Sequence, residues 1–110
     1  MDNRLREFYN RLIAIADFTA YENGIYLEHP IVYDFDDLMY SLGIVNYEFD
    51  WRSFDSEKII DIGTLSLEEV KNYITYIVRA DRFSGNNILY YMNNGVIQKL
   101  IKRLLKIYKE

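Results

Sequence analysis

The sequence predicts an all-α fold in which residues 1–110 form one compact domain of about five helices. Apolar residues recur at helical spacing over most of the chain, and residues typical of helix starts and stops separate these stretches. Half of the residues are hydrophobic, and a chain of 110 residues can bury one sizeable core but not two. Packing of these apolar faces, at about 1.5–3 kcal/mol for each buried side chain, therefore decides the fold.

The first helix is expected near the N-terminus. Its apolar face begins at Leu5 and continues at helical spacing to Thr19, and Asp2 is placed to cap it. Asn23-Gly24 then provides the left-handed stop that commonly ends a helix. The following residues, 25–32, contain the only proline of the chain and are expected to be extended.

The second helix is expected to begin at Asp34. A carboxylate at this position can accept a hydrogen bond from the free N–H groups of the first turn. Asp36 and Asp37 would lie in that turn, where negative charge suits the helix dipole. The helix should end near Leu42, with Gly43 beyond its end.

The last three helices have clear boundaries in the sequence. Ser66 and Glu69 have the spacing of a capping box at the start of the third helix. Ser84 is the expected cap of the fourth helix, which the Asn-Asn-Gly sequence at 93–95 interrupts. The last helix, 96–109, is apolar on one face and basic on the other. The basic face consists of Lys99, Lys102, Arg103, Lys106 and Lys109.

The segment 44–62 has two interpretations. Tyr47, Phe49 and Trp51 alternate with charged residues, which is the periodicity of a strand and predicts a minor β-hairpin. The same residues can instead form an aromatic-rich loop that packs against the core. Both alternatives are compatible with a helical domain.

Composition excludes several classes of site. The chain has no Cys, so it has neither disulfides nor thiolate chemistry, and its single His leaves too few ligands for a typical zinc site. No apolar run reaches the roughly 20 residues that span a bilayer, and the N-terminal sequence is unlike a secretory signal. We expect a cytoplasmic protein that needs no cofactor and has no membrane partner.

Charge is distributed unevenly along the chain. Residues 1–70 contain 15 acidic and 5 basic residues, whereas residues 71–110 contain 2 acidic and 8 basic residues. Such an asymmetry can be neutralised within the molecule, can pair two copies of the chain, or can present either surface to another partner.

Three charged residues, Arg79, Asp81 and Arg82, lie within four positions of the chain. In the structural interpretation they form a clamp: Asp81 accepts from an Arg or from backbone N–H groups, while Arg79 reaches Asp50 and stacks on Trp51. In the functional interpretation, the guanidinium groups grip a phosphate or carboxylate. We favour the clamp because charged residues at a corner between helices commonly tie it together. The ligand- or anion-binding candidates are Arg79, Asp81, Arg82, Asp50, Trp51 and Ser84.

Three short motifs follow one another in the second half of the chain: FDW at 49–51, RADRF at 79–83 and GVI at 95–97. Together they resemble a bacterial domain family of unknown function with FDW, R-x-D-R-F and closing G-[VI]-I helix elements. The likeness covers residues 49 to 105, and Asn86 and Asn87 depart from the family pattern. The resemblance implies a fold and no activity. It also implies that the signature positions are Asp50, Trp51, Arg79, Asp81, Arg82 and Phe83.

A carboxylate cluster and a histidine are further candidates. Asp34, Asp36 and Asp37, with Glu28 nearby, can in principle supply oxygen ligands to a divalent cation. Helix capping already accounts for Asp34 and Asp37, so we predict no metal site. No nucleophile motif accompanies His29, and we predict no catalytic residue.

Aromatic and acidic residues indicate a binding surface. The 11 tyrosines exceed what a small core can bury with every hydroxyl hydrogen-bonded, so several should lie at the surface, as rings do in interfaces. Direct nucleic-acid binding is not expected, because the chain is acidic overall. The partner-binding candidates are Asp34, Asp36, Asp37, Glu48 and Tyr47.

Two functional hypotheses follow. The first is a non-catalytic macromolecular interaction module, of the kind encoded as a bacterial or phage accessory or anti-defence inhibitor, which binds a protein partner through its acidic and Tyr-rich surface. That partner would be a nucleic-acid-handling protein or a second copy of the chain. The alternative is a pocket for a small ligand or nucleotide, conceivably hydrolytic, built around Arg79, Asp81, Arg82 and Trp51.

Overall fold

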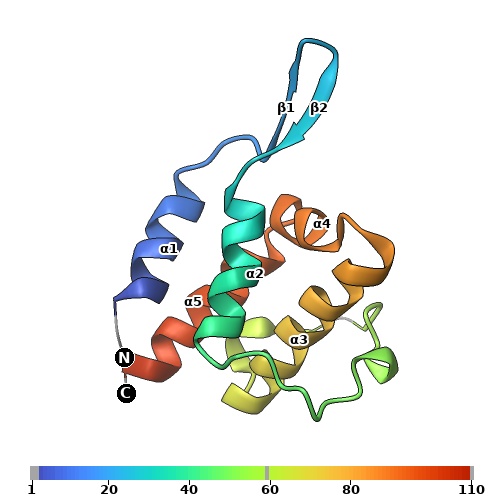
Figure 1. Ribbon diagram of the computed structural model, residues 1–110. Helices are drawn as coiled ribbons and strands as arrows, with labels where there is room; N and C mark the ends of the chain where they lie inside the picture. Colours follow the sequence, from blue (N-terminus) through green and yellow to red (C-terminus); the bar gives the residue numbers. More distant parts are fainter. Residues whose placement is uncertain (1–2, 59, 110) are drawn as a thin grey trace.

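The computed structural model describes residues 3–58 and 60–109, which contain five α-helices and a two-stranded antiparallel hairpin (Figure 1). This confirms the predicted helical fold. Two short 3-10 turns lie in the connection before the third helix. The elements are α1 (Arg4–Ile13), β1 (Thr19–Glu22), β2 (Ile25–Glu28), α2 (Ile31–Ser41), η1 (Trp51–Ser53), η2 (Ile62–Thr64), α3 (Leu67–Ser84), α4 (Asn87–Asn93) and α5 (Val96–Lys109).

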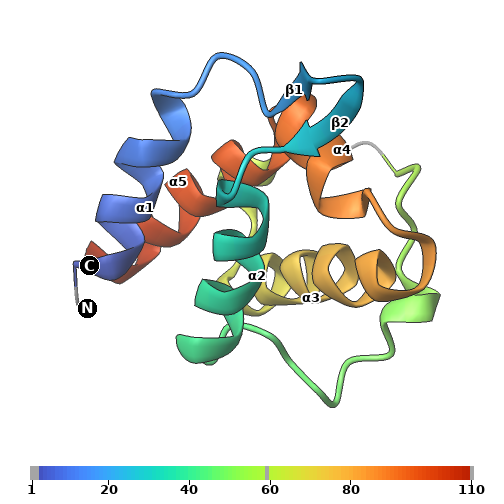
Figure 2. The ribbon, with the colours of Figure 1, turned by 45° about the horizontal axis from the view of Figure 1, so that its top comes forward.

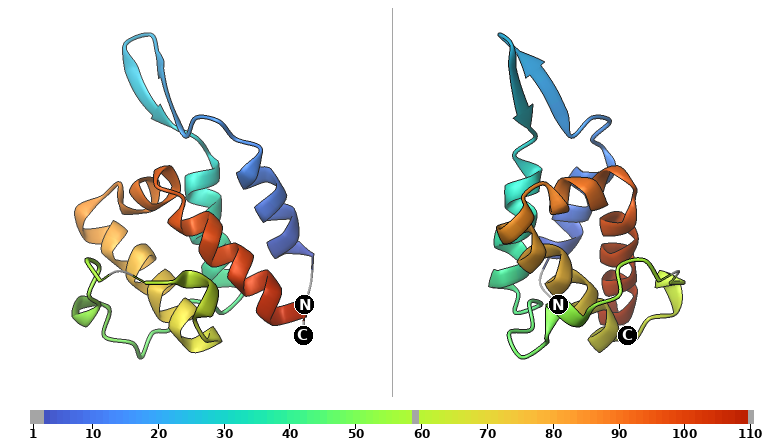
Figure 3. Two further views of the ribbon diagram at one scale, coloured as in Figure 1. Left: turned by 180° about the vertical axis from the view of Figure 1, so that it is seen from behind. Right: turned by 90° about the vertical axis from the view of Figure 1, so that its right-hand side faces the viewer.

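The core is built around α5. This helix contacts α1 on one side and α3 and α4 on the other, as the views from behind and from the side show (Figure 3). Ile97, Leu100, Ile101 and Leu104 of its apolar face are fully buried, and Leu105 and Tyr108 are half-buried against the same core. Phe8 of α1 packs against Phe35 of α2 with ring centroids 6.0 Å apart, which joins the first two helices to the same core. No helix in the described ranges is both long and apolar enough to cross a bilayer.

The hairpin lies at residues 19–28, not in the segment 44–62 where the strand periodicity allowed one. Helix α1 ends at Ile13, so Thr19 belongs to a strand and not to the first helix. Asn23 and Gly24, with φ of 52° and 76°, form the two-residue turn of this hairpin, and the expectation of a helix stop there is wrong. The hairpin projects from the helices (Figures 1 and 2).

The segment 44–62 is an ordered loop in its described part, which corresponds to the second of the two interpretations. The backbone N–H of Asn46 donates to the Thr75 hydroxyl oxygen at 2.8 Å, which ties the loop to α3. The ring of Phe54 stacks on Tyr76 with centroids 4.8 Å apart. These contacts hold the aromatic residues of the loop against the third helix.

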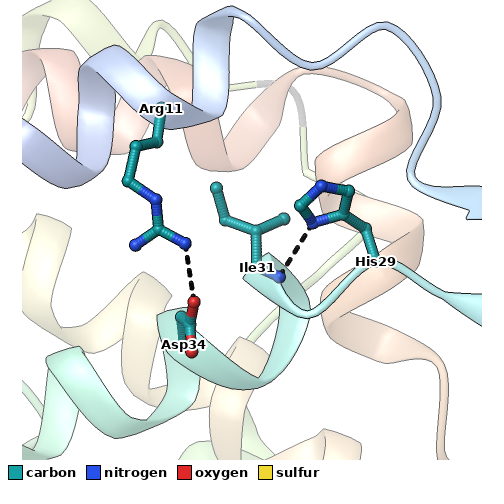
Figure 4. A network of polar contacts seen from close by, with 4 residues as sticks. All are labelled: Arg11, His29, Ile31 and Asp34. Atoms are coloured by element: carbon teal, nitrogen blue, oxygen red, sulfur yellow. Dashed lines mark hydrogen bonds and ion pairs between the residues drawn. The ribbon is translucent and has the colours of Figure 1, made fainter.

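Helix α2 begins three residues earlier than predicted, directly after Pro30. Its cap is therefore not Asp34: the ring nitrogen Nδ1 of His29 accepts a hydrogen bond from the Ile31 backbone N–H at 3.0 Å (Figure 4). Asp34 lies in the first turn and pairs with Arg11 of α1 at 2.7 Å. The predicted end is confirmed, because the helix stops at Ser41 and Gly43 has a φ of 70°.

Helix α3 begins as predicted. Ser66 and Glu69 form the capping box, with both reciprocal hydrogen bonds present at 3.2 and 2.9 Å. Its end differs from the prediction, because the helix continues to Ser84. The Ser84 hydroxyl donates to the Ala80 carbonyl oxygen within α3, so Ser84 does not cap the fourth helix. Asp2, the predicted cap of the first helix, lies outside the described residues.

Candidate functional site

The last two turns of α3 present three of the charged and aromatic residues singled out in the sequence. Arg79, Arg82 and Phe83 have the spacing i, i+3 and i+4, which places them on one side of the helix. They face aromatic residues from α2 and from the loop that contains η1. We call this surface the stacked face; it consists of Tyr40, Tyr47, Trp51, Arg52, Arg79, Arg82 and Phe83.

One half of the stacked face alternates guanidinium groups with tyrosine rings. The guanidinium carbon of Arg82 lies 5.0 Å from the centroid of the Tyr40 ring, and that of Arg79 lies 5.9 Å from the Tyr47 ring. The two tyrosine rings are themselves 5.9 Å apart. At exposed positions each cation–π contact contributes about 0.5–1 kcal/mol, so the series orders these side chains without burying them.

The other half is a stack on Trp51. The Trp51 and Phe83 rings are 5.3 Å apart with an interplanar angle of 28°, and the Arg52 guanidinium carbon lies 4.5 Å from the Trp51 centroid. The clamp interpretation assigned this stacking to Arg79, and the structure places Arg52 there instead. Asp50 forms no ion pair with any residue in the described ranges, so the expected Arg79–Asp50 contact is wrong as well.

Asp81 joins α3 to α4. Its carboxylate oxygen Oδ1 accepts a hydrogen bond from the Ile88 backbone N–H in the first turn of α4 at 2.9 Å. Asn86, directly before α4, has a left-handed conformation with φ of 59° and makes no capping hydrogen bond with its side chain. Asp81 therefore performs the capping role from the preceding helix. The expectation that Asp81 accepts from backbone N–H groups agrees with this contact.

An acidic groove of about 360 Å³ adjoins the stacked face. Its charged lining residues are Glu28, Asp36, Asp37 and Asp81, with Arg82 as the single base. Arg82 pairs with Asp36 at 3.4 Å. Burial raises the pKa of Asp36; the Arg82 charge opposes this shift, whereas the charges of Asp37 and Asp81 add to it. With four acids and one base, the groove suits a cation better than an anion.

The structure brings together some of the sequence candidates and separates others. Asp36 meets Arg82, and Tyr47 meets Arg79, although these pairs are distant in the sequence. Asp34 points to α1 instead, as Figure 4 shows. Glu48 is exposed in the loop, where its backbone N–H donates to the Asn46 side chain. In the described part of the chain, no group of three or more acids and histidines is placed to hold a metal ion.

Sequence reasoning did not select Tyr40, Arg52 or Phe83 as candidate binding residues. Helical spacing was the available clue for Tyr40, because it follows Asp36 and Asp37 at i+4 and i+3 on the same side of α2. For Arg52 the available clue was its position directly after Trp51 in the sequence, whereas Arg79 contacts Tyr47 instead.

The comparison with protein families gives one match. The model of a family of unknown function (DUF6508) matches residues 19–110 of the chain. The match includes the hairpin and α2 and is longer than the likeness seen in the motifs, which covered residues 49 to 105. No curated protein and no solved structure matches the chain.

Proposed function

We propose that this chain, which belongs to the DUF6508 family of unknown function, is a non-catalytic module that binds a protein partner through the stacked face and the adjoining acidic groove. One observation carries the proposal: Tyr47 and Phe83 are 71% and 68% exposed, yet both rings are held by arginine or aromatic neighbours. Exposed Tyr, Trp and Arg side chains dominate the energetics of protein interfaces. Rings that are already ordered lose less conformational entropy when a partner covers them.

The acidic groove indicates the chemistry of the partner. Glu28, Asp37 and Asp81 line it and form no ion pair with a residue in the described ranges, and Arg82, the base in its described lining, pairs with Asp36. A lysine or arginine of the partner would supply the missing positive charge. Between residues 17 and 57 the chain has ten acidic residues and one basic residue, which extends this preference to a wider surface.

A basic partner surface of this kind is typical of proteins that handle nucleic acids. The specific form of the proposal is therefore an accessory or inhibitor protein of bacterial or phage origin, which occupies the basic groove of such a protein. The anti-defence setting and the cytoplasmic location stay predictions. They are supported only by the acidic charge and the small size of the chain.

The alternative of a small-ligand or nucleotide pocket ranks second. It requires Arg79, Arg82 and Trp51 to present free surfaces to one ligand. Each of these side chains instead contacts another side chain of the stacked face. Asp81, its proposed base or orienting group, is engaged by the N–H of Ile88. A nucleotide that raises the melting temperature of the wild-type protein but not of Arg82→Ala would favour this alternative.

The proposed function is tested with variants of the exposed rings. The double variant Tyr47→Ser/Phe83→Ser removes both rings, and Tyr90→Ser removes an equally exposed ring on α4 outside the stacked face. Each immobilised protein is incubated with nuclease-treated bacterial lysate, and retained proteins are identified by mass spectrometry. We expect the wild type and Tyr90→Ser to retain the same protein and the double variant to lose it. Equal retention by all three would contradict the proposal, as would no retention by any folded form.

A further inference from the structure

A second groove, opposite in charge to the acidic groove and sharing no residue with it or with the stacked face, lies between η2 and α5. Figure 3 shows the turn beside this helix, and the two elements are in contact. The groove has a volume of about 360 Å³. One wall is the basic side of α5, and the other is the loop 60–63. The basic lining residues are Lys99, Lys102, Arg103 and Lys106.

The lysines of this groove are not paired with acids among the described residues. Lys99, Lys102 and Lys106 form no ion pair with any residue that the structure describes. The Nε of Arg103 donates to the Leu65 carbonyl oxygen at 2.8 Å, which fixes that side chain along the groove. Among the described lining residues the only acid is Asp61, and its carboxylate accepts from the Gly63 backbone N–H at 3.2 Å. Within residues 3–58 and 60–109, the groove therefore carries four bases against one acid that is already engaged.

The loop wall has an aliphatic part. Ile60 is half-buried and gives the groove hydrophobic surface opposite the lysines, whereas Ile62 lines the groove but is mostly packed in the core. No aromatic ring is among the lining residues. Single-stranded nucleic acids depend on stacking between bases and aromatic side chains, and this groove offers none. It offers instead a row of cations facing aliphatic surface.

From this arrangement we infer that the groove binds an extended acidic peptide segment in which carboxylate and aliphatic side chains alternate. In an extended chain successive side chains point to opposite sides, so carboxylates would face α5 while aliphatic side chains face Ile60 and Ile62. Alternate residues of such a chain are about 6.7 Å apart. Lys102 and Lys106 are separated by one helical turn, a rise of about 6 Å, so successive carboxylates can each meet a lysine.

This inference is independent of the proposed function, because the two surfaces share no residue and prefer ligands of opposite charge. Each can fail without the other. If Tyr47→Ser/Phe83→Ser no longer retains the protein partner, the result concerns the stacked face and leaves peptide binding in the basic groove unaffected.

The test measures binding of a fluorescent peptide of about five Glu-Val pairs to the intact chain by anisotropy. Lys102→Glu reverses one charge in the groove, and Lys109→Glu makes the same change on α5 outside the lining. We expect Lys102→Glu to weaken peptide binding by at least about tenfold and Lys109→Glu to change it far less. A Glu-Ser peptide of equal length should bind more weakly than Glu-Val, because it lacks the aliphatic side chains. Lys102→Gln should give an intermediate loss of peptide affinity. It removes the charge without reversing it, so it keeps the test valid if Lys102→Glu does not fold.

Four results would overturn the inference. The first is no binding of the Glu-Val peptide at low salt, and the second is an equal loss of peptide affinity in Lys102→Glu and Lys109→Glu. The third is tighter binding of an oligouridylate than of a Glu-Val peptide with the same number of charges. The fourth is self-association of the wild type that Lys102→Glu abolishes, which would assign the groove to a second copy of the chain.

Discussion

Removal of the Asp81 carboxylate should destabilise the junction between α3 and α4. Asp81→Ala leaves the Ile88 backbone N–H without the acceptor that now lies 2.9 Å away, and Asn86 makes no capping hydrogen bond that would replace it. A hydrogen bond to a charged acceptor contributes about 1.5–3 kcal/mol, and loss of a helix cap typically costs about 1 kcal/mol. The larger cost of about 3–5 kcal/mol applies to removing one partner of a fully buried ion pair, and Asp81 instead accepts from a backbone N–H.

Asp81 is half-buried, so water can partly solvate the exposed N–H in the variant. We therefore expect Asp81→Ala to lower the free energy of unfolding by about 1–2 kcal/mol. In a domain near this size, each kcal/mol lowers the melting temperature by about 4–8 °C. Asp81→Asn keeps a carbonyl oxygen at the same place and should lose less than half as much.

Urea unfolding followed by circular dichroism measures these changes, with Asp37→Ala as the matched control. Asp37 is exposed, and its side chain forms no hydrogen bond or ion pair with a described residue, so this variant should stay within about 0.5 kcal/mol of the wild type. If Asp81→Ala also stays within that range, or if Asp81→Asn is equally damaging, the capping argument is refuted.

Two further predictions concern a helix start and a buried charge. Ser66→Ala removes one acceptor of the capping box and should lower the free energy of unfolding by about 1 kcal/mol in urea; an unchanged midpoint would contradict this. Asp36→Asn should raise the melting temperature at neutral pH. The pKa of Asp36 is raised on folding, mainly by burial, so the folded protein holds this charge at a cost that appears as the pH rises through that pKa. The gain in melting temperature should vanish at a pH below 3.8, the ordinary pKa of this carboxyl, because Asp36 is then uncharged in both states. A lower melting temperature of the variant at neutral pH would show that the ion pair with Arg82 outweighs the cost of burial.

Much of the helical fold could be predicted because its determinants are local. The capping box at Ser66 and the apolar face of α5 each depend on a few residues of one segment, and both are confirmed. Asn23-Gly24 was misassigned because the same dipeptide suits a helix end and a hairpin turn. Only the pairing of Tyr21 with Tyr26 across the turn, with rings 5.2 Å apart, distinguishes the two.

The end of α3 was misplaced for a related reason. Ser84 is a good helix cap in isolation, but residues 79–83 have no strong helix breaker, and the helix continues until Gly85 with its φ of 68°. Because the segment is helical, Arg79 and Arg82 lie on one side and Asp81 points elsewhere, towards α4. Sequence reasoning selected Arg79 and Arg82 but missed Tyr40 and Arg52, because the pairing of these side chains depends on the backbone conformation.

In residues 3–58 and 60–109, ion pairs leave most of the charge asymmetry of the sequence in place. The Arg82–Asp36 pair joins the two halves, but its side chains are 55% and 26% exposed, and such a pair contributes about 0–1 kcal/mol. The lysines at 99, 102 and 106 face a groove whose one acid is already engaged. Charges that only stabilised the fold would be expected to meet one another. Because one groove is lined mainly by acids and another mainly by bases, each suits a partner of opposite charge, which supports the proposals of two binding surfaces on this chain.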